Sequence, residues 1–583
     1  MLDFSQGFSP ATHLLITIAA PLVGAVAAWL LGHRGLHAVR QSAAVSSLIT
    51  LALAGTLVLR FLSNAPPASG DFFASGELGW FVTGPLDIRF SVGLDGLSIW
   101  LFGLSALLTV TAVFVSWDAV QEKAVGFYGL LLLLEAAMLG VFAARDIILF
   151  YVFFEFTLVP LFFLIGIWGH DDRRRAAIKF FIYTFAGSVL AFLGLLAIVL
   201  WHASHTGVLS FDIATLTAGL ASHPLPMTPE WGYLQLWVFV ALFVGFAIKV
   251  PIVPVHTWLP LAHVEAPTGG SVDLAGVLLK IGIYGFLRFS LPMLPEAAAI
   301  AAPWLVALGA IGIVYGALVA LVQKDLKRMV AYSSVSHMGY CVMGLFALEP
   351  VAVEGANLQL INHGLASAGL FATVGMIYER YHTRKIAELG GIASQTPWLA
   401  AFFMLFTFSA IGLPGLNGFV GEFMVLAGTF QRAWSGAPAD WGSTYLTLAL
   451  LAVAGVVLGA WYMLQAAERV LFGTTRGATA GEHGEHAHDL AWYEVAALAP
   501  LGVFIVWIGV YPSPFLKASA AAVTASTQAS SQAFASRVSA SRAEATAEHD
   551  SPAEHGSSPA PDVDLTLHVG PSHSLSTSNH LAP

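Results

Sequence analysis

Long apolar runs separated by short polar stretches make up most of this chain. Each run spans roughly 18 residues or more, which is long enough to cross a bilayer as a helix. The runs lack the two-residue alternation that marks the strands of a membrane barrel. Inside lipid only a helix satisfies its own backbone hydrogen bonds, so the pattern predicts an all-α membrane protein.

The apolar pattern predicts about fourteen transmembrane helices, at residues 12–32, 41–62, 94–116, 125–143, 145–168, 175–201, 234–254, 271–291, 303–322, 328–347, 356–379, 397–430, 445–468 and 491–512. The seventh contains Pro251 and Pro254, and the twelfth contains the sequence Leu-Pro-Gly-Leu-Asn-Gly at 413–418. The twelfth range is also too long for one straight span. Proline and glycine interrupt helices, so both are predicted to be broken.

The two breaks divide the chain into units. Because they lie five helices apart, we expect two five-helix repeats, at 125–291 and 303–468, after three N-terminal helices in 1–124. Five is odd, so the second repeat would be inverted in the membrane, as in many transporters. A last helix follows at 491–512, and the Ala-, Ser-, His- and Pro-rich tail 513–583 is predicted to be disordered.

Basic residues in the loops orient the predicted helices. The odd-numbered loops hold fifteen, namely Arg34, Arg40, Lys123, Arg173, Arg174, Arg175, Lys179, Lys324, Lys327, Arg328, Arg380, Arg384, Lys385, Arg469 and Arg476. The even-numbered loops hold five, namely Arg60, Arg89, Arg145, Arg288 and Arg432. Lysine and arginine concentrate in cytoplasmic loops, so the odd loops are predicted to be cytoplasmic and both termini periplasmic.

Composition excludes several classes of function. The chain is 57% hydrophobic and only 10% charged, against about 25% charged in soluble domains. The single cysteine, Cys341, excludes a disulfide framework and a cysteine-ligated iron–sulfur cluster. No nucleotide-binding motif follows a strand pattern, and no nucleic-acid partner is expected. The Glu- and His-rich stretch 482–489 is predicted to be a solvated loop, since few of its spacings match a metal site.

Ionisable residues inside the predicted helices are the candidate chemistry. Glu155 lies in the fifth helix, Lys249 just before the break of the seventh, Lys280 in the eighth, and Glu422 just past the break of the twelfth. Each costs about 2.5–3.5 kcal/mol at mid-membrane, so we interpret them as proton-exchanging sites. A structural ion pair is the alternative, but buried pairs stabilise poorly. Glu135 in the fourth helix is a fifth candidate, for which both roles stay open.

Lysine and histidine suit a proton path. A lysine has an ordinary pKa of about 10.4, and a carboxylate that moves towards or away from a buried lysine would switch it between holding and releasing a proton. His337 and His363 fall within the tenth and eleventh helices, between Lys280 and Glu422 in helix order. They are candidate relays, and hydrogen-bonded core histidines are the alternative. His256 and His263 lie beside the seventh-helix break, where they would line a cytoplasmic access route or be ordinary interfacial residues.

Three stretches carry a resemblance to a known family. Lys249–Thr268, Asp325–Gly339 and Gly412–Phe419 resemble motifs of the antiporter-like subunits of respiratory complex I, NADH-quinone oxidoreductase. The resemblance covers about residues 90–512. Subunit M-like members of that family carry glutamate on the broken twelfth helix where many relatives carry lysine, and Glu422 stands at that position.

The resemblance implies a role for each candidate: Glu155 as acidic switch, Lys249 as its paired lysine, Lys280 as bridging lysine, His337 and His363 as relays, and Glu422 as terminal site. The chain itself would bind no cofactor. NADH, FMN, iron–sulfur clusters and quinone would belong to partner subunits. Neighbouring antiporter-like subunits and the lipid of a bacterial inner membrane would surround it.

Three alternatives stay open. A subunit of a multisubunit sodium/proton antiporter would share the same lysines and glutamates, although Glu422 favours complex I. The membrane arm of an energy-conserving hydrogenase would have nickel–iron partners. A purely structural scaffold would keep pumping unaltered after removal of Lys249 or Glu422.

Overall fold

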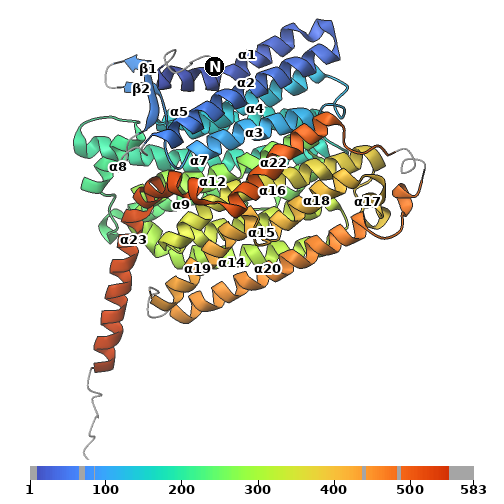
Figure 1. Ribbon diagram of the computed structural model, residues 1–583. Helices are drawn as coiled ribbons and strands as arrows, with labels where there is room; N and C mark the ends of the chain where they lie inside the picture. The colour runs from blue at the N-terminus through green and yellow to red at the C-terminus, as the bar shows by residue number, and fades with distance from the viewer. Residues whose placement is uncertain (1–8, 65–71, 84–85, 436–440, 482–486, 551–583) are drawn as a thin grey trace, which may run out of the picture.

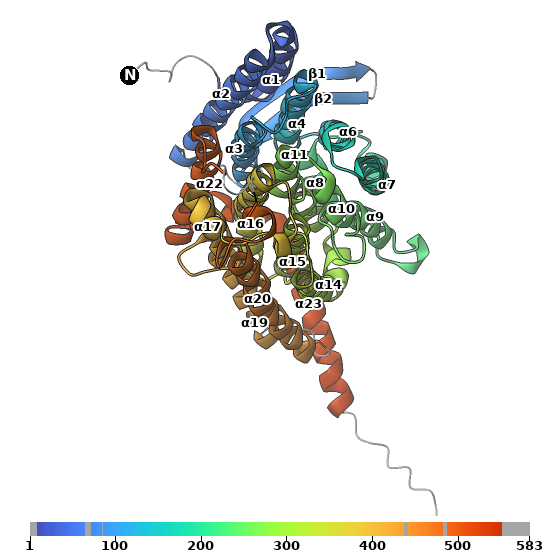
Figure 2. The same ribbon diagram turned by 90° about the vertical axis from the view of Figure 1, so that its right-hand side faces the viewer.

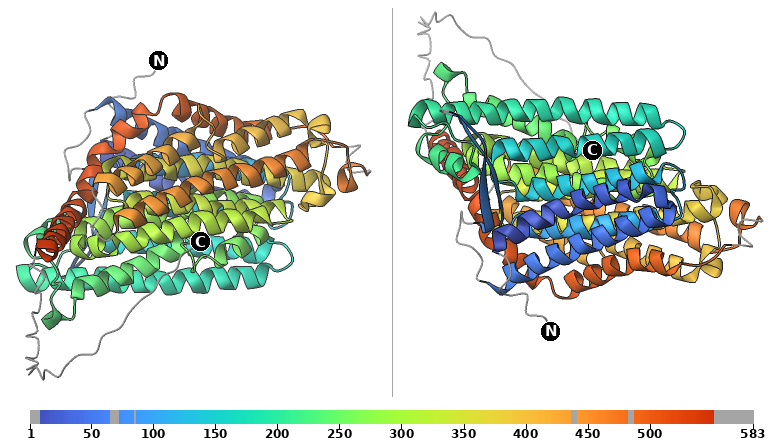
Figure 3. Two further views of the ribbon diagram at one scale, coloured as in Figure 1. Left: turned by 90° about the horizontal axis from the view of Figure 1, so that it is seen from below. Right: turned by 90° about the horizontal axis from the view of Figure 1, so that it is seen from above.

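The computed structural model describes residues 9–64, 72–83, 86–435, 441–481 and 487–550. Its helices lie side by side in a bundle, with most axes running in one direction (Figures 1 and 3). The N-terminal pair α1 and α2 forms one edge of the bundle, and α19 and α20 form the opposite edge (Figure 2). Each of the fourteen predicted ranges contains a helix.

The helices of the first half are α1 (Pro10–Leu30), α2 (Leu36–Ser63), α3 (Ile99–Val115), α4 (Ala124–Ala143), α5 (Ile147–Phe156), α6 (Leu158–Trp168), α7 (Arg173–Thr206), α8 (Ile213–Ser222), α9 (Leu234–Lys249), α10 (Trp258–Glu265), α11 (Thr268–Asp273), α12 (Lys280–Gly285) and α13 (Leu291–Met293). Those of the second half are α14 (Pro295–Leu321), α15 (Leu326–Phe346), α16 (Pro350–Tyr381), α17 (Ile392–Gln395), α18 (Pro397–Ala410), α19 (Asn417–Ser435), α20 (Gly442–Leu471), α22 (Trp492–Val510) and α23 (Ser513–Asp550).

Within the described residues, ten helical stretches are long and apolar enough to cross a membrane. Two of these join consecutive helices, α5 with α6 and α11 through α13. The other predicted spans are the short α3, the more polar α15 and the two broken helices. A multi-pass, all-α membrane fold is therefore confirmed.

Both predicted helix breaks are confirmed. In the first, α9 ends at Lys249 and α10 starts at Trp258. In the second, α18 ends at Ala410 and α19 starts at Asn417. Between Ala410 and Asn417 the backbone turns through left-handed conformations at Gly412 (φ 71°) and Gly415 (φ 94°), which glycine adopts without steric cost.

Side chains satisfy carbonyl groups that the first break frees. The indole nitrogen of Trp258 donates a hydrogen bond of 2.9 Å to the carbonyl of Ile248, in the last turn of α9. Lys179 of α7 donates through Nζ to the carbonyl of Thr257 at 3.0 Å. Such pairing is needed because an unsatisfied backbone group inside a membrane costs several kcal/mol.

A β-hairpin that the apolar pattern did not predict precedes α3. Strands β1 (Phe73–Thr83) and β2 (Leu86–Leu94) pair antiparallel at one end of the bundle (Figure 1). Arg145 ties the hairpin to the bundle, with ion pairs of 3.5 Å to Glu77 and 3.6 Å to Asp212. The hairpin lies outside the spans, where water can satisfy strand edges.

The prediction of a disordered tail at 513–583 is wrong for its first part. Ser513–Asp550 forms the long helix α23, which packs across α13, α14 and α16 at the end of the bundle where α8 lies (Figure 1). The reason is a sparse apolar face: Phe515, Val523 and Phe534 recur at helical spacing and are all buried. Residues 551–583 lie outside the described part.

Hydrogen bonds also fix α23. The hydroxyl of Ser530 donates to the carbonyl of Leu291 at 2.6 Å, and that of Ser531 donates to the carbonyl of Leu348 at 3.3 Å. α1 starts and α22 ends at this same end of the bundle (Figure 1).

The two predicted five-helix repeats stay a prediction, although each contains its expected break.

Candidate functional site

Lys280 opens a chain of buried polar side chains in the middle of the bundle. It is wholly buried, and its Nζ lies 2.8 Å from Nδ1 of His363 on α16. Nζ also donates to the carbonyl of Ala275. The preceding turn, Leu274–Leu278, is π-helical. Such turns are often found at functional sites, and this one presents a carbonyl that helps to aim the lysine at His363.

The chain continues through His337 to Glu422. Nδ1 of His337 lies 2.7 Å from Oε1 of Glu422, and Gln359 donates through Nε2 to the same oxygen at 2.9 Å. The rings of His337 and His363 lie 5.6 Å apart between centroids. Four side chains from α12, α16, α15 and α19 thus form a line with one gap, between the two histidines.

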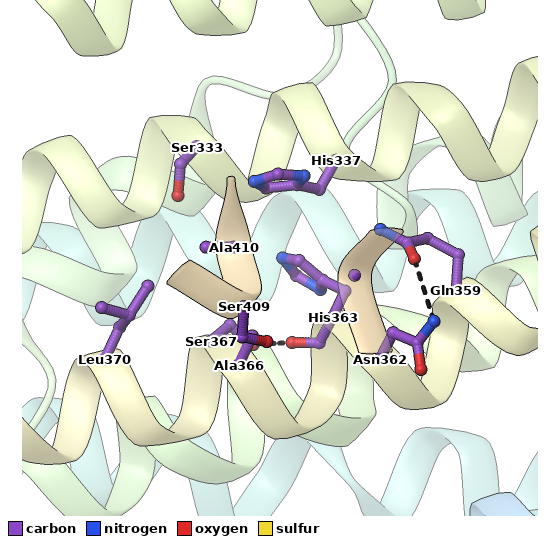
Figure 4. Close-up of a pocket in the computed structure, with 11 residues that line it drawn as sticks. Ser333, His337, Gln359, Asn362, His363, Ala366, Ser367, Leu370, Ser409 and Ala410 are labelled. Atoms are coloured by element: carbon purple, nitrogen blue, oxygen red, sulfur yellow. Dashed lines mark hydrogen bonds between the residues drawn. The ribbon is translucent and has the colours of Figure 1, made fainter. Parts of the chain in front are cut away.

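A small cavity lies at that gap (Figure 4). Its volume of about 10 Å³ is room for roughly one water. Nε2 of His337 and Nε2 of His363 are both buried and have no hydrogen-bond partner among the described residues. Ser333, Ser367 and Ser409 contribute hydroxyl groups to the lining. One water here has the polar partners to join the two rings.

Two asparagines fix the second helix break against α16. Asn362 donates through Nδ2 to the carbonyl of Asn417 at 2.8 Å, and Asn417 returns a hydrogen bond of 3.2 Å to the carbonyl of Asn362. Ser409, in the last turn of α18, donates to Oδ1 of Asn417 at 2.6 Å. Glu422 follows slightly more than one turn later, so this clamp sets its position.

Sequence reasoning did not select the asparagines or Gln359 as functional residues. The available signal was their place: Asn417 stands inside the Gly- and Pro-rich break, and Asn362 directly precedes His363. Neutral amides carry no charge penalty in lipid, so they attract less notice than lysine or glutamate.

Removing the clamp is expected to impair the site. Asn417→Ala deletes the three hydrogen bonds of the Asn417 side chain, with the Ser409 hydroxyl, the Asn362 carbonyl and the backbone N–H of Gly418. Each buried group left unpaired costs about 1–3 kcal/mol. We expect a lower unfolding temperature of the purified complex and proton uptake about threefold to tenfold slower. Asn64→Ala, at the exposed end of α2, is the control. Wild-type uptake and unfolding temperature in Asn417→Ala would contradict this account.

Lys249 and Glu155 lie close together but are not joined. Lys249 is only 2% exposed, and its Nζ lies 4.7 Å from the ring centre of Phe154. Glu155, half-buried on α5, lies near Tyr151 and Ser188 and within electrostatic range of the lysine. The described residues show no ion pair between Lys249 and Glu155 within 4.0 Å.

The helices that carry the two lysines touch. A methyl group added at Gly282 of α12 would meet the carbonyl oxygen of Phe246 on α9 at 2.7 Å. Lys249 and Lys280 therefore project from closely packed helices, yet no hydrogen bond joins them among the described residues. A proton would need mobile water to pass between them.

The remaining candidates are all in the interior. His263 is wholly buried and stacks on Phe371 with 4.4 Å between ring centroids, while His256 packs edge-on against Tyr315 at 5.1 Å. Glu135 is wholly buried on α4 and is not part of the Lys280–Glu422 chain.

The described residues contain no group of three or more His, Cys, Asp or Glu side chains that would hold a metal. The Glu- and His-rich stretch lies mostly outside the described residues, at 482–486. Its last residue, Asp489, caps α18 by accepting from the backbone of Trp398 at 2.8 Å and Leu399 at 3.1 Å.

The fold and the buried line of ionisable side chains define a class. This is a polytopic membrane protein whose ionisable side chains are arranged for proton exchange. Residues 144–458 match the family described as NADH:quinone oxidoreductase/Mrp antiporter, TM. The chain belongs to this family.

One relative and two solved structures show which members of the family this chain resembles. NADH-quinone oxidoreductase subunit M of Rhodobacter capsulatus is 42% identical, over 79% of this chain and 87% of that protein. A chain of respiratory complex I from Thermus thermophilus has a TM-score of 0.73 and 31% identity, covering 89% of this chain and 99% of that one. A chain of the Mrp complex from Dietzia has a TM-score of 0.70 and 25% identity, covering 88% and 52%.

Proposed function

We propose that this chain is the subunit M-type, proton-translocating membrane subunit of an NADH-quinone oxidoreductase. The observation that carries the proposal is the line Lys280–His363–His337–Glu422, buried in the bundle. Its one gap, between the two histidines, is a water-sized cavity. The likeness to subunit M along most of both chains supports the same assignment.

The proton path has two parts. Glu155 and Lys249 act as a switch, because their separation changes how strongly the lysine holds its proton. Lys280 then receives a proton through water and passes it to Nδ1 of His363. The proton crosses to His337 through the cavity, and Glu422 is the terminal acceptor before release.

Histidine suits the middle of this path because it can accept a proton at one ring nitrogen and release one at the other. Nδ1 of His363 faces Lys280 while its Nε2 is available towards the cavity. His337 has the mirror arrangement, with Nδ1 on Glu422. A proton therefore enters each ring on one side and leaves on the other.

The subunit works within a larger assembly. We assign NADH, FMN, iron–sulfur and quinone chemistry to partner subunits, and expect the chain in a bacterial inner membrane beside other antiporter-like subunits. Basic residues favour the odd loops, so both termini are assigned to the periplasmic side. Electron transfer elsewhere would then drive the Glu155–Lys249 switch.

A subunit of a sodium/proton antiporter is the second candidate, because the Mrp chain shares the fold. The membrane arm of an energy-conserving hydrogenase is a third. Gentle-detergent purification of the tagged protein followed by mass spectrometry separates them. We expect co-purified flavin and iron–sulfur subunits with NADH-quinone activity. Small membrane subunits without any redox protein would overturn the complex I assignment.

A further inference from the structure

Two buried carboxyl groups lie outside the proposed path. Glu135 on α4 and Asp273 at the end of α11 are both wholly buried. None of their four carboxyl oxygens has a hydrogen-bond partner among the described residues. Burying an ionisable side chain in a membrane interior costs free energy even when it is paired, so such a residue points to a functional role.

The two carboxyl groups lie along one seam, where α4 and α11 both pack against α3. Tyr128 of α4 donates through its hydroxyl to the carbonyl of Ser116, which ends α3, at 3.0 Å. Glu135 lies seven residues further along α4, so it shares the face of Tyr128. α4 therefore turns Glu135 towards α3.

α11 reaches the same seam. Gly269 packs so closely on Ser116 that a methyl group added there would overlap the serine hydroxyl. Asp273 follows four residues later on the same face. Both α4 and α11 run away from the end of α3 marked by Ser116, and Glu135 and Asp273 lie within electrostatic range of each other.

The charge on the two carboxyl groups determines how many protons they bind. Two neighbouring carboxylates with no cation would repel strongly in a medium of low dielectric constant. A single proton removes that repulsion. Because neither carboxyl hydrogen-bonds directly to the other, a bridging water would carry the proton between them. Carboxyl pairs that share a proton in this way titrate as a unit.

We propose that Glu135 and Asp273 form a proton-sharing carboxyl pair that stores one exchangeable proton beside the Lys280 chain. The π-helical turn Leu274–Leu278 starts at the residue after Asp273. The ammonium of Lys280 donates a hydrogen bond to the carbonyl of Ala275 in this turn. A rearrangement of this one turn therefore moves both groups.

The proposed exchange is a simple proton transfer. The ammonium of Lys280 gives its proton through water to the ionised carboxylate of the pair, which leaves a neutral amine and a second neutral carboxyl. The reverse step reloads the lysine. This inference rests on the proposed function, since it adds a storage site to that path.

Infrared difference spectroscopy of the whole purified complex tests the pair without depending on pumping. We expect a carboxylic C=O band that shifts in deuterium oxide, is altered in Glu135→Gln and in Asp273→Asn, and is absent from the double variant. A band unchanged in both single variants would overturn the proposal. A band that sodium chloride removes, where potassium chloride does not, would also overturn it in favour of a cation site.

Proton uptake in vesicles tests the exchange. We expect Glu135→Gln and Asp273→Asn each to slow NADH-driven uptake about threefold or more, and the double variant to be no slower than the worse single one. The exchange variant Glu135→Asp/Asp273→Glu keeps two carboxyls and should recover part of the rate. Glu354→Gln, at a half-buried carboxyl on α16 away from the seam, is the control.

Full pumping in both single variants would reduce the pair to a static proton and overturn the storage role. NADH–ferricyanide activity and complex size, measured for every variant, distinguish a loss of assembly from a loss of proton uptake. If the single variants fail to assemble, uptake by Glu135→Asp/Asp273→Glu tests the storage role. Failure of the proposed function itself would appear elsewhere, as normal pumping after Lys280→Met. The infrared band would still report on the pair in that case.

Discussion

Lys280→Met is expected to abolish nearly all proton uptake that depends on this subunit. Methionine fills a similar volume but carries no proton, so His363 loses its donor at 2.8 Å. A positioned acid–base group typically contributes about 10²–10⁴-fold to a proton transfer. We expect NADH-driven uptake in membrane vesicles to fall at least about tenfold, with NADH–ferricyanide activity unchanged.

The matched control is Lys385→Met. Lys385 is an exposed loop lysine whose ammonium pairs with Glu388 three residues later at 2.9 Å. Exposed pairs of this kind contribute about 0–1 kcal/mol, so pumping and assembly should stay at the wild-type level. Equal losses in Lys280→Met and Lys385→Met would point to general damage and count against a specific role for Lys280.

Glu422→Gln is expected to have the second largest effect. The amide keeps the size of the carboxylate and can still hydrogen-bond to Gln359, but it cannot take up a proton from His337. The path would then end at the histidine, and we expect uptake about tenfold slower with little change in thermal stability. Stopped-flow uptake with a pH-sensitive dye measures it.

Glu388→Gln, in the exposed loop after α16, is the control for this substitution. A second check uses Glu422→Asp, which restores an ionisable group one methylene shorter and should recover part of the rate. Unchanged uptake in Glu422→Gln would mean that the terminal acceptor lies elsewhere, even if Lys280 proved essential.

The helix spans and breaks were predictable because their causes are local. Apolar length defines a membrane span, and the prolines after Lys249 and the glycines around Leu413 interrupt helices wherever they stand. The β-hairpin and α23 were not predicted for a related reason. Both lie outside the spans, and α23 hides widely spaced apolar residues such as Phe534 among many alanines and serines.

The candidate site was predictable only as a set of residues. The cost of burying Lys280 or Glu422 singled them out one by one. Their order in space was not predictable, since Lys280 and His363 meet across 83 residues and His337 and Glu422 across 85. Such contacts depend on how four helices, α12, α15, α16 and α19, pack. The asparagine clamp was missed because its members are uncharged. Asp273 was overlooked although it lies in the same predicted helix, 271–291, as Lys280.

The central claim is that protons cross this subunit through the Lys280–His363–His337–Glu422 line. The most direct test is the number of protons taken up per NADH oxidised by the purified complex in sealed liposomes, for wild type and Lys280→Met in parallel. A lower ratio in the variant, or slow turnover with no uptake through this subunit, is the predicted result. The wild-type ratio at the wild-type rate would contradict the account.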